Sequence, residues 1–248
     1  MTTGRRSALV TGATRGIGRG IAERLAVDGF DLTISARDPE ALEATADHLR
    51  SLGGVTVVAQ AGELGEPDDI AAVVDAHRMA HGDMSVLVLN AGVGSLGKIG
   101  DIPMHRFQKL IDLNLRAPLL YLQAALPLLR AAAESDHRHG AKVIAMSSIT
   151  GVYAEPHLAV YGATKAALGM LIETLNIEQG SSGITGTAIA PGYVDTDLAA
   201  WKHDDLSPDS MMPVSDVAEL VGSLVALSRR TMVGQVVMAR SSSDGRRA

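Results

Sequence analysis

Apolar runs of strand length alternate with segments of helical periodicity along the whole chain. The strand-like runs are 8–11, 31–35, 56–60, 86–89, 142–146, 186–190 and 235–238. The helical segments between them are 18–27, 40–52, 67–79, 104–132, 159–179 and 215–227. This alternation predicts a doubly wound α/β fold, in which helices flank both faces of a parallel sheet of about seven strands. No repeat, low-complexity segment or long linker divides the chain, so we expect residues 1–248 to form one domain.

Composition supports the buried parallel sheet and excludes several classes of function. Hydrophobic residues make up 46% of the chain but aromatic residues only 3%, which suits strands covered by closely packed helices. The net charge of −6 and the lack of a basic stripe argue against binding to nucleic acid. The chain has no cysteine, and therefore no disulfide, thiolate nucleophile or thiolate metal site.

The sequence lacks the patterns of a secretory signal, a membrane span and a metal site. The N-terminal residues resemble no secretory signal, and no apolar run approaches the length of a membrane span. We therefore expect a soluble cytoplasmic protein that binds no membrane. His137 and His139 lie close together in a polar segment but lack a third ligand at metal spacing, so we expect no metal site.

A glycine-rich turn follows the first predicted strand. Gly12, Gly16 and Gly18 occur where that strand ends and a helix begins, which is the setting of a dinucleotide-binding (Rossmann) turn. Glycines at these positions let the backbone approach a pyrophosphate, and the helix N-terminus then faces the anion. A glycine cluster alone is weak evidence, because ordinary turns also collect glycine.

The end of the second strand bears on the choice between NAD and NADP. Asp38 lies about where an acid takes the ribose 2′-hydroxyl of NAD, but it precedes Pro39 and also suits a helix N-cap. Arg37, together with Arg15 of the glycine turn, could instead bind a 2′-phosphate. We therefore favour NADP(H) and keep NAD(H) as the alternative; Arg37 could also be a solvated loop charge.

Tyr161 and Lys165 are four residues apart on a predicted helix, so they share one face. A phenol titrates near 10, and a nearby ammonium favours the phenolate and lowers that pKa. The pair would then exchange a proton with a substrate. The plain alternative is a surface pair with a partly buried ring.

Several further motifs occur in a fixed order along the chain. Asn90-Ala91-Gly92 follows the fourth strand, and Asn114 lies in the long central helix. Ser148 ends the fifth strand and precedes Tyr161 by 13 residues. A Pro-Gly-x-Val-x-Thr segment, residues 191–196, follows the sixth strand. Together with the glycine turn, this ordered set resembles the short-chain dehydrogenase/reductase family over nearly the whole chain.

The resemblance implies a role for each catalytic position. Tyr161 would deliver the proton to a carbonyl oxygen, or remove it in the oxidation direction. Lys165 would lower the tyrosine pKa and bind the nicotinamide ribose. Ser148 would donate to the carbonyl oxygen; Ser147 is rejected because strand alternation points it to the other face. Asn114 would bind a water that links Lys165 to solvent by kinking its helix.

The same resemblance implies the residues that contact the cofactor. They are Gly12, Thr14, Arg15, Gly16, Ile17, Gly18, Arg37, Glu63, Leu64, Asn90, Ala91, Gly92, Tyr161, Lys165, Pro191, Gly192, Val194 and Thr196. Glu63 departs from the family, whose members usually have an aspartate there, so only that contact is in doubt. The substrate loop, 197–214, is short and contains Trp201. The C-terminal tail, 240–248, lacks the usual glycine-rich finish.

These features favour an NADP(H)-dependent oxidoreductase that reduces a ketone or 3-oxoacyl carbonyl to an alcohol, and a small-molecule substrate. Relatives that dock an acyl carrier protein tend to carry an arginine where this chain has Ile177, which weakens that reading. The alternative from another class is a dinucleotide-binding regulator or sensor with little catalysis. An epimerase would need a further C-terminal domain. The resemblance also implies a homo-oligomer, a tetramer or dimer.

Overall fold

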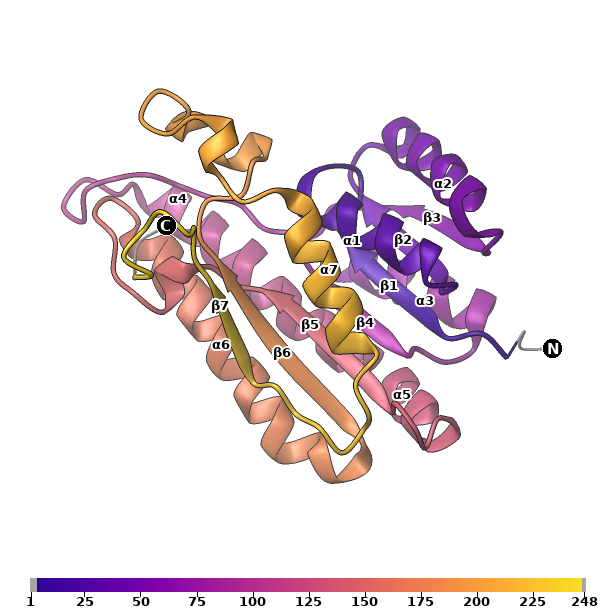
Figure 1. Cartoon of the computed structure of the whole chain (residues 1–248). Coiled ribbons are helices and arrows are strands. Elements are labelled where there is room, and N and C mark those ends of the chain that lie inside the picture. Colours follow the sequence, from indigo (N-terminus) through magenta and orange to yellow (C-terminus); the bar gives the residue numbers. More distant parts are fainter. Residues whose placement is uncertain (1–3, 247–248) are drawn as a thin grey trace.

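The computed structural model describes residues 4–246, which form a seven-stranded parallel sheet (Figure 1). The strand order is β3-β2-β1-β4-β5-β6-β7, so the order reverses between β1 and β4. Ser7 of β1 lies opposite Asp31 of β2, and Ala8 lies opposite Val86 of β4. The strands are β1 (Ser7–Thr11), β2 (Asp31–Ala36), β3 (Val57–Ala61), β4 (Val86–Leu89), β5 (Ala141–Met146), β6 (Ile184–Pro191) and β7 (Gln235–Met238).

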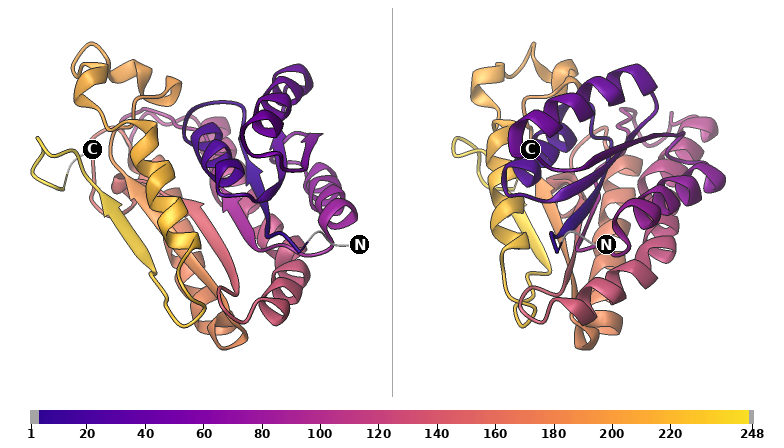
Figure 2. Two further views of the ribbon diagram at one scale, coloured as in Figure 1. Left: turned by 45° about the vertical axis from the view of Figure 1, so that its right-hand side comes forward. Right: turned by 90° about the vertical axis from the view of Figure 1, so that its right-hand side faces the viewer.

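Helices cover both faces of the sheet (Figure 2). One face packs on α1 (Gly16–Val27), α2 (Pro39–Gly53) and α7 (Val214–Val225). The other packs on α3 (Pro67–His81), α5 (Ala117–Ser135) and α6 (Ala159–Gln179). Strands β1, β2, β4, β5 and β6 are buried along their whole length, as expected for a sheet covered on both sides. The predicted doubly wound α/β fold is confirmed.

One predicted helix differs from the prediction. The segment 104–132 is α4 (Met104–Ile111), then a π-helical stretch η1 (Asp112–Arg116), then α5. Periodicity did not separate this break, because a π-helical stretch of five residues is too short to show its own spacing between two α-helices. Single π-helical turns inside α-helices are frequent at functional sites, and this one carries the buried Asn114.

Two glycines bring the end of β5 close to α6. The 3-10 turn η2 (Ile149–Gly151) packs on α6 just after Ser148. A Cβ on Gly162 would lie 2.6 Å from the Thr150 carbonyl oxygen, and one on Gly151 would lie 2.8 Å from the Lys165 carbonyl carbon. Only glycine permits this approach, and it brings Ser148 beside the helix that carries Tyr161.

A side-chain amide then fixes α6 on the sheet. Asn176 Nδ2 donates to the carbonyl oxygen of Gly186 in β6 at 2.9 Å, and Asn176 Oδ1 accepts from the Gly186 N–H at 2.6 Å. Both groups are buried, where paired polar groups hold two elements in one relative position. Within residues 4–246, none of the helices combines the length and hydropathy needed to cross a bilayer.

Candidate active site

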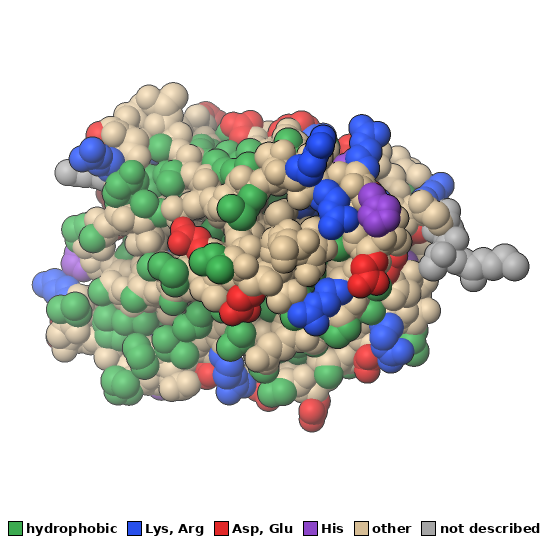
Figure 3. Space-filling view, turned by 90° about the horizontal axis from the view of Figure 1, so that it is seen from below, with side chains coloured by type: hydrophobic (Ala, Val, Ile, Leu, Met, Phe, Trp, Pro, Cys, Tyr) green, Lys and Arg blue, Asp and Glu red, His purple; other side chains and the backbone are tan. Residues whose placement is uncertain are grey.

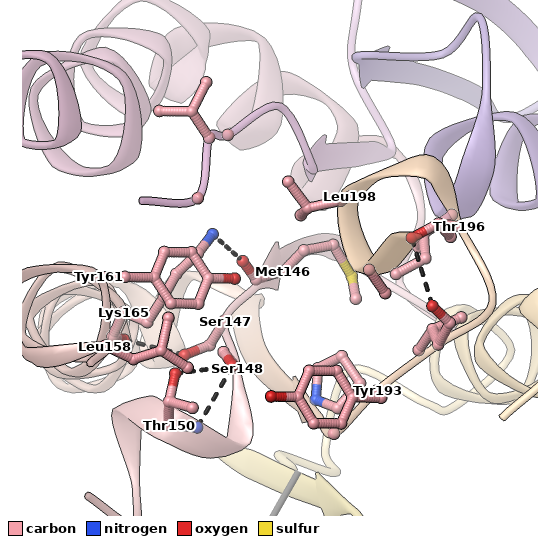
Figure 4. Close-up of a pocket in the computed structure, with 18 of the residues that line it drawn as sticks. Met146, Ser147, Ser148, Thr150, Leu158, Tyr161, Lys165, Tyr193, Thr196 and Leu198 are labelled. Atoms are coloured by element: carbon pink, nitrogen blue, oxygen red, sulfur yellow. Dashed lines mark hydrogen bonds between the residues drawn. The ribbon is translucent and has the colours of Figure 1, made fainter. Parts of the chain in front are cut away.

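A cavity of about 290 Å³ opens beyond the carboxyl ends of the strands, where doubly wound sheets bind ligands (Figure 4). The glycine turn, the loops after β4, β5 and β6, and the start of α6 all contribute to its lining. The structure therefore brings together residues that are far apart in the sequence. The predicted site residues that line the cavity are Ile17, Asn90, Gly92, Ser148, Tyr161, Lys165, Pro191, Gly192, Val194 and Thr196.

Tyr161 lies in the first turn of α6 and is half-buried in the cavity wall. Burial raises the pKa of its phenol above the usual value for a tyrosine, and the Ser148 hydroxyl acts in the opposite direction. The expected lowering of this pKa by Lys165 is therefore wrong for the structure. Desolvation disfavours the phenolate more strongly than the neighbouring groups stabilise it, so the phenol is protonated at neutral pH.

Lys165 is buried one turn further along α6, and its ammonium faces the end of β5. Lys165 Nζ donates to the Met146 carbonyl oxygen at 2.7 Å and lies 5.8 Å from the Tyr161 ring centroid (Figure 4). Burial lowers the pKa of Lys165 to about 8, because the charged form is poorly solvated there. The lysine remains mostly charged at neutral pH. It lies beside the tyrosine, but its hydrogen bond goes to the backbone carbonyl of Met146.

Ser148 and Ser147 both line the cavity but have different hydrogen bonds. Ser148 Oγ accepts from Thr150 Oγ1 at 2.9 Å and from the Thr150 N–H at 3.2 Å. Its own hydrogen is therefore not needed for these bonds. Ser147 Oγ donates to the Lys165 carbonyl oxygen at 2.9 Å, which fixes α6 against β5. This difference supports Ser148 as the predicted donor to substrate.

Asn114 is almost fully buried in η1, and its carboxamide binds a loop. Asn114 Oδ1 accepts from the Val93 N–H and Nδ2 donates to the Val93 carbonyl oxygen, both at 2.9 Å, while Nδ2 also lies 3.2 Å from Thr164 Oγ1. These bonds tie the loop after β4 to the π-helical break. A Cβ on Gly92 would lie 3.0 Å from Asn114 Oδ1 and 3.3 Å from Lys165 Nζ, so the lysine and the amide flank this glycine.

The glycine turn has the backbone that the sequence predicts. Gly12 and Gly16 have φ of 68° and 53°, in the left-handed region that favours glycine. Gly18 permits close packing, since a Cβ there would lie 2.2 Å from the Gly12 carbonyl oxygen. The N-cap residue of α1, Arg15, makes no side-chain capping bond, and Thr14 lies in the same turn. The first amides of α1 are thus open to an anion, and these residues fit a pyrophosphate.

Thr11 was not predicted as a site residue, but its hydroxyl holds the loop after β4 in place. Its hydroxyl donates to the Val88 carbonyl oxygen at 3.1 Å and accepts from the N–H groups of Asn90 and Ala91 at 3.0 and 3.1 Å. Asn90 Nδ2 in turn donates to the carbonyl oxygens of Thr11 and Gly12. The loop after β4 is therefore bound to the glycine turn across the point where strand order reverses.

The charged residues considered for binding the ribose end of the cofactor are Asp38, Arg37 and Arg15, and the structure gives each a different environment. Asp38 is the N-cap of α2 and accepts from the N–H groups of Glu40 and Ala41, which confirms the capping alternative. Arg37 is exposed beside it. Arg15, which was expected to bind a 2′-phosphate together with Arg37, is instead paired with Asp197. Its Nη1 donates to Asp197 Oδ2 at 2.9 Å, and both side chains are mostly exposed.

Three predicted cofactor contacts, Glu63, Leu64 and Ala91, do not line the main cavity. Leu64 and Ala91 line a second, much smaller cavity next to Thr11 and Tyr121. Glu63 is exposed, and its N–H donates to Asp69 Oδ2 at 2.7 Å.

The outer wall of the main cavity comes from side chains for which the sequence offers little signal. Tyr193, next to Gly192, lines the cavity, whereas the exposed Tyr153 and His157 do not. Leu198, Ala199 and Trp201 lie in the predicted substrate loop, whereas the apolar lining residues that sequence reasoning did not identify are Val93, Leu96, Met146 and Leu158. They come from several loops, and only the folded chain places them together.

Comparison with known proteins agrees with this geometry. The family model for short chain dehydrogenase matches residues 6–207. A 3-oxoacyl-[acyl-carrier-protein] reductase FabG of Staphylococcus aureus is 31% identical over 242 residues, covering 94% of this chain and 95% of the relative.

Two solved structures are similar throughout. A 3-oxoacyl-[acyl-carrier protein] reductase from Brucella melitensis in complex with NAD is 30% identical with a TM-score of 0.85, covering 96% of each chain. The Pseudomonas aeruginosa RhlG/NADP active-site complex is 30% identical with a TM-score of 0.86, covering 96% of this chain and 95% of that chain. With the family model and these relatives spanning the site described above, the chain belongs to the short-chain dehydrogenase/reductase family and is an oxidoreductase.

Proposed function

We propose that this protein is an NADP(H)-dependent reductase that converts a ketone-type carbonyl to an alcohol, with Tyr161 as the proton donor. One observation carries the proposal. The hydroxyl-bearing side chains of Tyr161 and Ser148 line one cavity, and the charged Lys165 lines it beside Tyr161 (Figure 4). A reductase site needs this set, because charge that develops on the carbonyl oxygen has to be neutralised as it forms.

The nicotinamide cofactor, when bound, supplies the hydride for reduction. The glycine turn and the open amides of α1 would hold its pyrophosphate, and the residues around Gly92 and Gly192 would hold its nicotinamide end.

The side chains then perform the proton chemistry. Tyr161 is protonated at neutral pH because burial raises its pKa, so its Oη holds the proton that the substrate oxygen receives. Ser148 Oγ accepts from Thr150 and keeps its own hydrogen for the same oxygen. As the phenol loses its proton, the Lys165 ammonium stabilises the negative charge left behind.

NADP(H) is favoured over NAD(H) by the charges at the end of β2. Asp38 Oδ1 is engaged in capping α2, and the neighbouring Arg37 is exposed and available to a 2′-phosphate. The RhlG complex contains NADP, whereas the Brucella reductase contains NAD. NAD(H) therefore remains the alternative cofactor.

Reduction of a 3-oxoacyl group belongs to the proposed class, since relatives of this chain carry that activity in their names. Ile177 is 85% exposed on α6, at the position where carrier-protein-binding relatives tend to have an arginine. A free small-molecule ketone is accordingly preferred over a carrier-bound substrate. Cytoplasmic location and a homo-oligomeric state remain predictions.

The proposal is tested by the variant Tyr161→Phe. We expect kcat for NADPH-dependent reduction of a ketone panel to fall about a hundredfold or more, because a positioned general acid contributes on that order. NADPH affinity, followed by fluorescence of the reduced cofactor, should stay within about twofold. Oxidation of NADPH is measured by loss of its absorbance.

Tyr153→Phe is the matched control, because Tyr153 is exposed on the same connection and does not line the cavity. It should retain the wild-type rate. Near-normal turnover by Tyr161→Phe would contradict the assignment. If the wild-type chain binds NADPH but reduces no ketone of the panel, the sensor alternative is favoured instead.

A further inference from the structure

Apart from the catalytic hydroxyls and Lys165, the side chains of the cavity wall are largely apolar. Among the described residues that line the cavity, Lys165 is the only one with a charged side chain, and its ammonium is bound to the Met146 carbonyl oxygen. A carboxylate or phosphate on a substrate would find no guanidinium or free ammonium there. The wall instead consists of Leu96, Met146, Leu158, Tyr193, Leu198 and Trp201.

The apolar surface continues to the mouth of the cavity. Leu96, Leu198 and Trp201 line the cavity and are also 39%, 54% and 45% exposed, so each extends from the interior into solvent. They come from two segments, the loop after β4 and the 3-10 segment η4 (Asp197–Lys202). A Cβ on Gly94 would lie 3.5 Å from Leu198 Cδ1, which shows that the two segments are in contact. Exposed apolar surface continuous with a pocket marks a binding surface.

This wall is held in place by its own contacts. The Tyr193 and Trp201 rings meet edge to face with centroids 5.8 Å apart. Tyr193 Oη donates to Glu155 Oε1 at 2.8 Å, which fixes the ring. Behind it, Tyr193 packs in a small hydrophobic cluster with Ala199, Met211 and Leu206. The surface that faces a substrate is therefore preformed, so binding requires little reordering.

We propose that the substrate is a ketone with a long hydrophobic substituent, which lies along Leu96, Leu198 and Trp201 while its carbonyl reaches Tyr161 and Ser148. This inference rests on the proposed function, because it assumes that the carbonyl is the reacting group. Trp201 is the residue that selects for the hydrophobic substituent, since it is the largest side chain of the wall and spans interior and mouth.

The experiment compares unbranched 2-alkanones from 2-butanone to 2-octanone with the anionic ketone pyruvate, using NADPH and the full chain. In the wild type, kcat/KM should rise about fourfold for each buried methylene, which corresponds to about 0.8 kcal/mol. Pyruvate should be turned over far more slowly than 2-octanone. Trp201→Ala should lower kcat/KM for 2-octanone at least tenfold and leave 2-butanone within about twofold.

Met79→Ala is the matched control, because Met79 is an exposed hydrophobic residue on α3 away from the cavity. It should preserve the dependence on chain length. Activity that is independent of chain length, or greatest with pyruvate, would overturn the substrate class while leaving the reductase assignment intact. An unchanged 2-octanone value in Trp201→Ala would overturn the role of Trp201.

A binding measurement separates this inference from the proposed activity. Trp201 is the only tryptophan of the chain, so intrinsic fluorescence reports directly on the cavity mouth. Saturable change with 2-octanone, absent with pyruvate, supports the hydrophobic site even if no ketone is reduced. No change with 2-octanone in a wild-type chain that also fails to reduce it would overturn the inference.

Discussion

At the scale of single residues, burial shifts the pKa values of the site in favour of the neutral forms. Tyr161 is kept protonated by desolvation, and Lys165 has a lowered pKa of about 8 for the same reason. The pKa of the tyrosine rises and the pKa of the lysine falls, but both shifts have one cause: burial around the start of α6 disfavours the charged form of each group. A protonated phenol suits the donor of a reductase, and proton delivery then depends on the nearby ammonium once the phenolate forms.

Cofactor preference is also a residue-scale question, and Arg37 is the residue to test. Arg37→Ala should raise the Kd for NADPH about 10- to 100-fold, because a hydrogen bond to a charged phosphate contributes about 1.5–3 kcal/mol. The Kd for NADH should change less than about twofold. Both constants are measured by cofactor fluorescence.

Arg19→Ala is the control for this change, since Arg19 is an exposed arginine of α1 that pairs with Glu23. It should bind both cofactors as the wild type does. Equal weakening of NADPH and NADH by Arg37→Ala would mean that Arg37 does not recognise the 2′-phosphate.

At the scale of elements, the site depends on close approaches that only small residues allow. The η2 turn meets α6 through Gly151 and Gly162, and the glycine turn folds back on itself at Gly18. The π-helical break performs a related task, because it places Asn114 where its amide pairs with the backbone of Val93. Each feature joins two segments that carry site residues.

Gly18→Ala tests the glycine turn. The added methyl would lie 2.2 Å from the Gly12 carbonyl oxygen and 2.4 Å from Asn90 Nδ2, and the first of these is backbone that cannot rotate away. We expect a lower melting temperature and a Kd for NADPH raised at least tenfold, measured by thermal unfolding and cofactor fluorescence.

The companion variant Gly100→Ala places a methyl where nothing lies within 4 Å, so it should change neither quantity. Wild-type stability and affinity in Gly18→Ala would show that the turn adjusts freely and that close packing there is not required.

At the scale of the whole molecule, strand order creates the site and the surface suggests its assembly. Charged side chains of both signs intermingle on the right-hand half of the face seen in Figure 3, while hydrophobic side chains gather on the left-hand half. On α6, Met170 and Ile177 are 62% and 85% exposed, and they lie two helical turns apart on the same outer face. Exposed apolar residues on one helix face are typical of an interface between subunits.

The homo-oligomer expected from the family is tested on that face. Wild-type protein should elute as a dimer or larger species, and the double variant Met170→Glu with Ile177→Glu should shift it toward monomer, because paired helices would bury the added charges. Size-exclusion chromatography with light scattering measures the mass. Val27→Glu, at an equally exposed position on α1, is the control. A monomeric wild type at micromolar concentration would rule the expectation out.

The sequence by itself determined the features that depend on neighbours along the chain. Alternating apolar runs predicted the strands, with β4 and β7 at their observed bounds, and the spacing of Tyr161 and Lys165 predicted a shared helix face. Tertiary structure alone decided the features that depend on distant contacts. The Lys165 ammonium turns to Met146, Arg15 pairs with Asp197, and Trp201 completes the cavity wall. Periodicity records which face of an element is buried, whereas a side chain's partner is set by segments that meet only when the sheet forms.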